Sequence, residues 1–427
     1  MNEKVKVAAA HATDYQPQTI ERATDEILAQ LGGLESLVPK DAKVFIKVNL
    51  VRDMPPEKCG TTHPQVVIAL VNKLSEITQN IVVGDSSGGL YTKAAMGQVY
   101  AKCKMTDVAE QTCAKLNDDF DFATAEINGQ VVKSCEITDS FLNADVVINV
   151  TKLKTHSFAG YTGAVKNLYG LIPGLVKVEM HSRYPDLGDF CQLLCDIEQF
   201  ASKKIVLHVI DGIVGMDGDG PTNGKPKAIG QLMASTNPYA LDVVAVSLFA
   251  DPFEMPLLQV AEKRGLVSRD LSAIDFDFEA WQSAKVADFD ISPVTSADTF
   301  LNMPKWVKKL AKKYLTKKVQ IDKNVCRGCG KCARHCPAKA ITVKEGKANI
   351  AQNKCIRCYC CQELCPFDAV RFKKSLLYRF VHAFSHTENK SKKRNATSKQ
   401  SNVEQNNTAN NTANNNANNN ANDNTNV

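Results

Sequence analysis

Eight cysteines near the carboxyl end stand in two near-identical runs, and this spacing constrains the chain more than any other feature. The first run is Cys326-x2-Cys329-x2-Cys332-x3-Cys336-Pro337, and the second is Cys355-x2-Cys358-x2-Cys361-x3-Cys365-Pro366. The chain has 427 residues and 15 cysteines, so it is far longer than the small secreted domains that disulfides staple together. The two runs therefore indicate a metal centre rather than a disulfide framework.

The gaps within each run suit cubane 4Fe–4S clusters. Two-residue gaps allow one loop to wrap three thiolates around one cube, whereas the cysteine after the three-residue gap reaches the other cube. The predicted ligands of the first cluster are Cys326, Cys329, Cys332 and Cys365, and those of the second are Cys355, Cys358, Cys361 and Cys336. The alternative is a pair of zinc sites, but zinc normally takes two separated pairs of ligands, which these runs fit poorly.

Residues 320–372 strongly resemble the two-cluster bacterial ferredoxins, and the resemblance implies one-electron exchange with a redox partner protein. Apolar residues follow each run, as strands that cover the clusters would: Ala340, Ile341, Val343, Ala369, Val370 and Phe372. Cys360 interrupts the repeat as an additional thiol. Its spacing to Cys365 does not suit a ligand, so we expect it to pack beside the cluster.

Charge divides the chain into an acidic body and a basic carboxyl-terminal section. Residues 1–302 carry 27 Lys/Arg against 39 Asp/Glu, whereas residues 303–394 carry 24 against 5. The sequence predicts an α/β domain over 1–302, a basic amphipathic linker over 303–319, a ferredoxin-type 4Fe–4S domain over 320–374, a basic amphipathic segment over 375–388 and a disordered Asn-rich tail over 389–427. The basic segments fit docking on the acidic body, contact with an acidic redox partner or a membrane surface, or simply a solvated basic surface.

Residues 1–302 alternate between short apolar runs and helical patterns, which predicts a mostly parallel sheet flanked by helices. The predicted strands are Val5–Ala10, Val44–Val51, Ile81–Asp85, Val146–Val150, Ile205–Ile210 and Ile229–Ala234. Several are continuous Val/Ile runs, which is typical of strands buried on both faces. The predicted helices are Thr19–Leu31, Pro64–Gln79, Thr106–Leu116, Leu187–Phe200, Pro238–Phe249 and Met255–Arg264. Asn128-Gly129 predicts a hairpin between the strands 123–127 and 131–137.

The composition also excludes some classes of protein. No apolar run reaches the ~18 residues that a membrane span needs, and the start of the chain lacks the apolar core of a signal peptide. We therefore expect a cytoplasmic protein with no transmembrane span and no nucleic-acid partner. We expect Cys191 and Cys195, four residues apart in a predicted helix, to be buried as small apolar residues.

Polar and charged residues gather where the predicted strands end. Lys47 and Asn49 end one strand, and Asp85 and Ser86 begin a Gly/Ser loop whose N–H groups could cradle an anion. The segment Thr151–His156 is predicted to be a basic loop after another strand. Ligands of open α/β sheets bind at the carboxyl ends of the strands, so these segments are predicted to share a crevice for a small anionic ligand.

The candidates fall into two groups. Those for ligand binding are Lys47, Asn49, Asp85, Ser86, Lys152 and Lys166, and those for catalysis are His156, Lys154, Asp211 and Asp242. His156 could transfer protons near pH 7, and Asp211 and Asp242 could form a carboxylate pair. A Gly-rich segment, 216–225, could form a lid over the site. The alternatives are a glycine turn, a solvated basic loop and a plain surface loop.

The same segments resemble family 362 of the domains of unknown function over about residues 5–290. The residues that carry the resemblance are Lys47-Val-Asn49, Thr61-Thr-His63-Pro64, Gly84-Asp85-Ser86, Lys152-Leu-Lys154-Thr-His156, Lys166-Asn167, Asp211-Gly212 and Asn237-Pro238 with Asp242. Members often carry a ferredoxin module at the carboxyl end, as this chain does. The resemblance implies the domain division but no catalytic role for any residue.

The sequence leads to one main functional hypothesis and two alternatives. The main hypothesis is an iron–sulphur redox protein with two 4Fe–4S clusters that transfers electrons to or from a ligand or partner of the α/β domain. The first alternative is an electron carrier or docking subunit without enzymatic activity. The second is an α/β enzyme whose clusters are structural or regulatory.

Overall fold

The computed structural model describes residues 4–291, 304 and 317–373. Residues up to 291 and residues 318–373 belong to one compact unit. The predicted helix in the linker 303–319 and the segment 375–388 lie almost entirely outside the described residues, as does the whole Asn-rich tail over 389–427. Among the described residues, no helix has both the length and the apolar character needed to cross a membrane.

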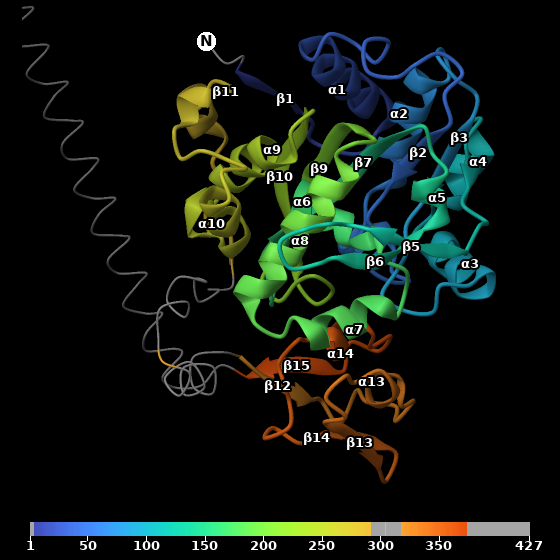
Figure 1. Cartoon of the computed structure of the whole chain (residues 1–427), viewed down its shortest axis with the longest axis vertical. Coiled ribbons are helices and arrows are strands. Elements are labelled where there is room, and N and C mark those ends of the chain that lie inside the picture. Colours follow the sequence, from blue (N-terminus) through green and yellow to red (C-terminus); the bar gives the residue numbers. More distant parts are fainter. Residues whose placement is uncertain (1–3, 292–303, 305–316, 374–427) are drawn as a thin grey trace, which may run out of the picture. The chain divides into compact units, whose positions relative to one another are not determined.

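A nine-stranded sheet forms the centre of the amino-terminal domain (Figure 1). Its strands, in order across the sheet, are β11 (Ile274–Asp275), β1 (Val5–His11), β10 (Lys225–Ser235), β9 (Ile205–Asp217), β7 (Val146–His156), β2 (Val44–Lys47), β3 (Ile81–Gly84) and β4 (Lys115–Leu116), with β8 (Gly160–Thr162) paired to β7. Strands β9, β7, β2, β3 and β4 are parallel, whereas β10 is antiparallel to both neighbours. The mostly parallel sheet that the sequence predicts is therefore present.

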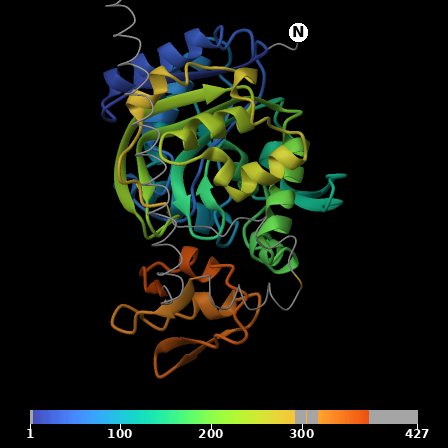
Figure 2. The same ribbon diagram turned by 90° about the vertical axis from the view of Figure 1, so that its left-hand side faces the viewer.

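Helices flank this sheet and build two hydrophobic cores (Figure 1 and Figure 2). One core contains residues of α1 (Pro17–Gln30), α2 (Pro64–Leu74), α3 (Lys93–Lys102) and α4 (Thr106–Gln111). The other contains residues of α5 (Asp139–Leu142), α6 (Ala164–Asn167), α7 (Val176–Arg183), α8 (Leu187–Ala201), α9 (Pro238–Ser247) and α10 (Pro256–Lys263). Short 3-10 turns span Pro56–Lys58, Leu168–Leu171, Pro252–Glu254, Leu271–Ala273 and Ala280–Ala284.

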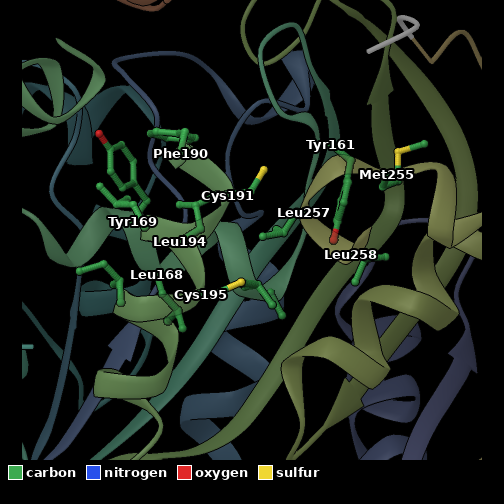
Figure 3. Packing of buried hydrophobic residues seen from close by; sticks show 14 of the residues in the cluster. Tyr161, Leu168, Tyr169, Phe190, Cys191, Leu194, Cys195, Met255, Leu257 and Leu258 are labelled. Carbon is green, nitrogen blue, oxygen red and sulfur yellow. The ribbon is translucent and has the colours of Figure 1, made fainter. Parts of the chain in front are cut away.

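Alternate residues of the central strands enter different cores. Phe45 and Val147 belong to one core, whereas their neighbours Ile46 and Ile148 belong to the other. This is why the strands read as continuous apolar runs, since both of their faces must be apolar. Figure 3 shows Cys191 and Cys195 of α8 among apolar side chains of one core, and both thiols are fully buried, as predicted.

The hairpin predicted from Asn128-Gly129 is confirmed. Strand β5 (Phe122–Glu126) pairs antiparallel with β6 (Ser134–Thr138). The φ angle of Asn128 is 54°, in the left-handed region that asparagine tolerates better than most residues.

Several predicted boundaries are wrong. The basic segment Thr151–His156 is not a loop, because β7 continues through it and all eleven residues of the strand are buried. Likewise β9 continues to Asp217, and the Gly-rich segment after it is the turn into the antiparallel strand β10. The predicted helix Thr106–Leu116 ends at Gln111, and its last two residues form β4. The charged residues of β7 and β9 find partners inside the protein, which the local pattern of the sequence does not reveal.

The carboxyl-terminal module is built from two small antiparallel strand pairs and two short helices. Strand β12 (Lys318–Ile321) pairs with β15 (Val370–Lys373), and β13 (Ile341–Lys344) pairs with β14 (Lys347–Ile350), both antiparallel. Helix α13 (Lys331–Arg334) follows the second cysteine of the first run, and α14 (Cys360–Glu363) occupies the same position in the second run.

Candidate iron–sulphur centre and anion pocket

Four cysteines surround a hollow in the carboxyl-terminal module. Its volume is ≈ 350 Å³, counted with its opening to solvent, and its lining includes Cys326, Cys329, Cys332 and Cys365. These are the four residues that the crossed spacing rule assigns to the first cluster. Within the described residues, no group of three or more His, Cys, Asp or Glu is arranged to hold a single metal ion. Four thiols around one hollow suit a cubane cluster, which is held by four cysteine thiolates.

The second set of cysteines also gathers in one place. Burial, followed by the thiols of Cys358, Cys355, Cys332 and Cys336, raises the pKa of Cys361 well above its usual value. For the first set, burial and then Cys365, Cys329 and Cys326 raise the pKa of Cys332 to about 11. The thiols of each set thus influence one another electrostatically, and Cys332 of the first set also influences Cys361 of the second.

Backbone N–H groups point at several of these sulphurs. Ala340 N donates to Cys336 Sγ (3.2 Å), Ala348 N to Cys326 Sγ (3.4 Å) and Ala369 N to Cys365 Sγ (3.3 Å). Such bonds stabilise thiolate ligands and tune the reduction potential of a bound cluster. The apolar residues after each run thus contribute backbone donors as well as cover.

A second hollow, the proposed anion pocket, lies where the second cysteine run meets the amino-terminal domain. It measures ≈ 680 Å³ with its opening to solvent. The amino-terminal domain contributes Asn49, Val51, Asp85, Ser86, Gly88, Lys154, His156, Thr162, Lys166, Asn167, Tyr169, Gly170, Lys177, Val178, His181 and Pro221, and the cysteine module contributes Cys360, Glu363 and Leu364. The predicted crevice is therefore formed by Ser86, Lys154, His156 and Lys166, but Lys152 and Asp211 do not line it.

Three lysines give the pocket its charge. Burial, followed by repulsion from Lys166, lowers the pKa of Lys154 to about 7, although Lys154 Nζ donates to Asn49 Oδ1 (2.5 Å) and to Gly60 O. Burial also lowers the pKa of Lys177 to about 7, and its Nζ donates to the backbone oxygen (2.8 Å) and hydroxyl (2.9 Å) of Ser86. Lys166 lies 5.8 Å from the ring centre of Tyr169 and has no hydrogen bond or ion pair with the described residues.

His156 and Glu363 meet across this pocket. His156 Nδ1 accepts bonds from the N–H groups of Phe158 and Ala159 (both 3.2 Å), so the neutral ring carries its proton on Nε2. Nε2 lies 3.3 Å from Glu363 Oε1, an oxygen that lacks an aligned hydrogen bond. Burial, followed by Lys166, lowers the pKa of His156 to about 4. The expectation that His156 titrates near pH 7 is therefore wrong.

Glu363 stays ionised despite its burial. Burial alone would raise its pKa, but His156 and Lys166 hold the pKa at about 2. Besides Glu363 Oε1, two buried polar atoms of the lining have no hydrogen-bond partner among the described residues: Thr162 Oγ1 and His181 Nδ1. A bound ligand could satisfy both.

Other candidates are occupied within the chain. Lys47 is 1% exposed and pairs with Asp85 (Nζ to Oδ1, 2.7 Å), which also accepts bonds from Leu50 N and Ser86 N. The N–H of Gly88 donates to Val51 O (3.5 Å). The N–H groups of Ser86 and Gly88 therefore bond within the protein. The Gly/Ser loop is thus not the open anion-binding loop that the sequence predicted.

Lys152 and Asp211 form a separate buried pair. Lys152 Nζ lies 2.8 Å from Asp211 Oδ2 and donates to Tyr15 OH (2.6 Å). Tyr15 OH donates to Asp211 Oδ1 (2.8 Å), and the Tyr15 ring stacks on His63 at 3.7 Å. This network links β9 and β7 to the start of α2, and it leaves no free charge for a ligand.

Asp242 does not pair with Asp211, so that expectation is wrong. Asp242 accepts bonds from Tyr161 OH (2.9 Å), Ala164 N (2.6 Å) and Val165 N (3.3 Å). A Cβ on Gly163 would come within 2.2 Å of Asp242 Oδ1, so this contact requires glycine. Burial raises the pKa of Asp242 to about 7. The residue anchors α9 against α6.

Comparison with known protein families agrees with this division of the chain. The model of a domain of unknown function, DUF362, matches residues 44–247, and that of the 4Fe–4S dicluster domain matches residues 318–366. The suspected fusion is therefore confirmed. The three lysines that line the pocket all lie within the residues that match DUF362.

One curated relative and two solved structures give further comparisons. A thylakoid-associated protein of Synechocystis sp. is 29% identical over 272 residues, covering 61% of this chain and 79% of that protein. The lactate racemase apoprotein of Thermoanaerobacterium thermosaccharolyticum has 14% identity and a TM-score of 0.34, covering 56% of this chain and 55% of that one. A Thermotoga maritima protein has 10% identity and a TM-score of 0.30, covering 54% and 57%. The chain thus spans little more than half the length of these two solved structures.

Sequence reasoning missed several residues of the pocket, among them Thr162, Lys177, His181 and Glu363. Lys177 and His181 lie on α7, a helix that the pattern did not predict because its apolar face is short. Glu363 stands inside the second cysteine run, at the position that Arg334 occupies in the first. This reversal of charge between two near-repeats was visible in the sequence and could have indicated that the two runs face different surroundings.

Proposed function

We propose that this DUF362 protein is an electron-transfer protein that holds two 4Fe–4S clusters and exchanges electrons with a small anion bound in the adjoining pocket. The observation that carries the proposal is the shared lining of that pocket. Lys154, Lys166 and Lys177 of the DUF362 domain face Cys360 and Glu363 of the loop that carries the second cysteine run. A ligand there would lie beside the second cluster.

Two ligand sets would hold the clusters. Cys326, Cys329, Cys332 and Cys365 would bind the first, and Cys355, Cys358, Cys361 and Cys336 the second. When bound, each cluster supplies one-electron redox chemistry. The hollow lined by the first set and the backbone N–H groups at the sulphurs support this assignment.

The residues of the pocket would bind and orient the anion. Lys166 has no internal ion pair with the described residues, and Lys154 and Lys177 lose only neutral partners when they turn to a ligand. Thr162 Oγ1 and His181 Nδ1 would add hydrogen bonds, since both are buried and unpaired. Lys154, with a pKa of about 7, could give a proton to a ligand that gains electrons. These roles make Lys154 a binding and proton-donating residue and His156 a positioning residue that holds Glu363, with Lys47, Asn49, Asp85 and Ser86 as supports.

The proposed electron path needs a redox partner. The predicted cytoplasmic location and the peripheral membrane contact of the basic segments stay predictions. The thylakoid association of the Synechocystis relative would be consistent with such contact.

Anaerobic purification and redox titration test this function. We expect about eight irons per chain and two cluster signals in electron paramagnetic resonance. Sulphate in the pocket should lower the reduction potential of one cluster only, because a nearby anion opposes the added electron, and reduction should in turn weaken sulphate binding. Two clusters with neither sulphate binding nor a shift in potential would instead favour a simple electron carrier. Activity that survives removal of the clusters would favour an enzyme with structural clusters.

A further inference from the structure

We propose that the exposed rim of the first cluster hollow is the docking face for an acidic one-electron carrier protein. The inference rests on the proposed function, because the electron needs a cluster to receive it. It adds the place where electrons enter and the kind of partner that brings them.

The first cysteine run opens to solvent at one ligand. Of the eight proposed ligands, Cys329 alone is exposed, whereas the others are buried or partly buried. Phe367 lines the same hollow and is 42% exposed, which is unusual for a large apolar side chain. An exposed ring beside an exposed ligand is suited to close contact with another protein, because aromatic side chains are enriched at the centre of such interfaces.

Basic side chains surround this opening. Arg327 and Lys331 line the hollow and are exposed. Arg334 is also exposed, and its guanidinium donates to Cys329 O (3.1 Å). Residues 318–373 contain 12 Lys/Arg and only 4 Asp/Glu.

Half of those acidic residues face the DUF362 domain. Asp368 pairs with Arg52 and with Lys58 (3.0 Å), and Glu363 lies at His156. The charged residues that line the first hollow, Arg327 and Lys331, are both basic, which favours an acidic partner and speeds its approach.

The chain's own segments and a lipid surface are poorer occupants. Residues 305–316 contain five lysines and no acidic residue, so their charge opposes contact with a basic rim. An anionic membrane would satisfy the charge but would bring no electron donor to Cys329. An acidic carrier with a flavin or a 2Fe–2S centre supplies both the negative charge and the electron.

The proposed step is the transfer of a single electron from the carrier to the first cluster. One electron would leave the reduced carrier, which would be oxidised, and reduce the cluster that Cys326, Cys329, Cys332 and Cys365 would hold. No bond forms or breaks, and no proton needs to move. The second cluster, beside the pocket, would receive the electron next.

The test reverses charge at the rim and compares two electron donors. The double variant Arg327→Glu/Lys331→Glu is mixed anaerobically with reduced flavodoxin, an acidic flavin protein, in a stopped-flow instrument. Lys354→Glu is the matched control, because Lys354 is exposed in the same module but does not line the hollow. Isothermal titration calorimetry with oxidised flavodoxin measures docking independently of electron transfer.

We expect the double variant to lose at least tenfold in both reduction rate and affinity at low salt, while Lys354→Glu stays within twofold of the wild type. The wild-type rate should fall with added salt, because the attraction acts between exposed charges. Reduced methyl viologen, a cation, should reduce the double variant as fast as the wild type or faster. The milder variant Arg327→Gln/Lys331→Gln should lose less, which guards against a folding defect, as do unchanged iron content and absorption spectrum.

Equal flavodoxin affinity in the wild type and the double variant would overturn the docking face. So would binding of the wild type to anionic vesicles through the same residues without reduction by flavodoxin. Absence of clusters would contradict the proposed function instead, and calorimetry would still decide whether the rim binds the acidic carrier.

Discussion

The two cysteine runs have the same backbone conformation but different surroundings. Gly328 and Arg357, at equivalent positions, have φ angles of 65° and 60°, and Gly330 and Tyr359 have 76° and 63°. Left-handed angles cost a residue with a side chain about 1–2 kcal/mol, so the second run adopts this path against the preference of its residues. The need to wrap three cysteines around one centre explains why both runs fold alike.

The side chains follow what each run faces. The first run places Lys331 and Arg334 in solvent, whereas the second places Cys360 and Glu363 at the same positions in the anion pocket. Tyr359 packs edge-on against Phe372 at 5.0 Å, and Gln362 Nε2 donates to Asp219 O (2.8 Å) of the DUF362 domain. The proposed function would place these near-repeats at two ends of an electron path, one open to a partner and one closed over a ligand.

The largest expected effect separates the two runs directly. Cys329→Ser and Cys358→Ser should each reduce the iron content from about eight to about four per chain, because each removes a ligand of one cubane. Iron and sulphide analysis with electron paramagnetic resonance measures this. The sulphate-sensitive signal should survive in Cys329→Ser and disappear in Cys358→Ser. The opposite result would reverse the assignment of which cluster lies beside the pocket.

Loss of one lysine should be the next largest effect. Lys154→Ala should weaken sulphate binding by about 1.5–3 kcal/mol, the usual contribution of a charged hydrogen bond, without changing the iron content. Isothermal titration calorimetry with sulphate measures the change.

Lys152 gives a contrasting control on the same strand. Lys152 pairs with Asp211 away from the pocket. Lys152→Ala should therefore lower the free energy of unfolding by about 3–5 kcal/mol, because a buried carboxylate loses its partner. Equal losses of sulphate affinity in both variants would show that Lys154 acts only through the fold.

Sulphate binding should also depend on pH near neutrality. Lys154 and Lys177, with pKa values of about 7, are mainly protonated below pH 7 and mainly neutral above it. Sulphate remains a dianion over this range, so its affinity should be highest near pH 6 and fall as the pH rises through about 7. The double variant Lys154→Met/Lys177→Met should bind weakly at every pH. A flat profile in the wild type would mean that neither lysine meets the anion.

A smaller effect should come from the position where the two runs differ in charge. Glu363→Gln removes a carboxylate from the pocket and should strengthen sulphate binding about three- to tenfold, as expected for a partly screened like charge. Arg334→Gln, at the equivalent position of the first run, should leave sulphate binding unchanged. Calorimetry on both variants makes the comparison, and a similar change in both would contradict the asymmetry.

The smallest expected effect concerns Cys360. Its Sγ lies 3.9 Å from Cys358 O, and its spacing does not suit a ligand. Cys360→Ser should therefore keep about eight irons per chain, whereas the neighbouring Cys361→Ser should lose half of them. Iron loss in Cys360→Ser would make Cys360 a ligand and remove Cys361 from the set.

The sequence alone determined the cluster type, the sheet with helices on both sides and the basic character of the module. Each depends on short spacings or on local composition, which tertiary contacts do not alter. Continuous Val/Ile runs required two apolar faces, and Asn128-Gly129 required a tight hairpin.

Only the tertiary structure decided which charges are free. Lys152 and Lys154 are two residues apart on β7, yet Lys152 pairs with Asp211 and Lys154 reaches the pocket. Lys47 is likewise neutralised by Asp85, whereas Lys177 and Glu363 come from segments that the sequence did not connect with the site. The physical reason is that the charge of a buried side chain depends on the atoms within a few ångströms, and those atoms come from residues far apart in the chain.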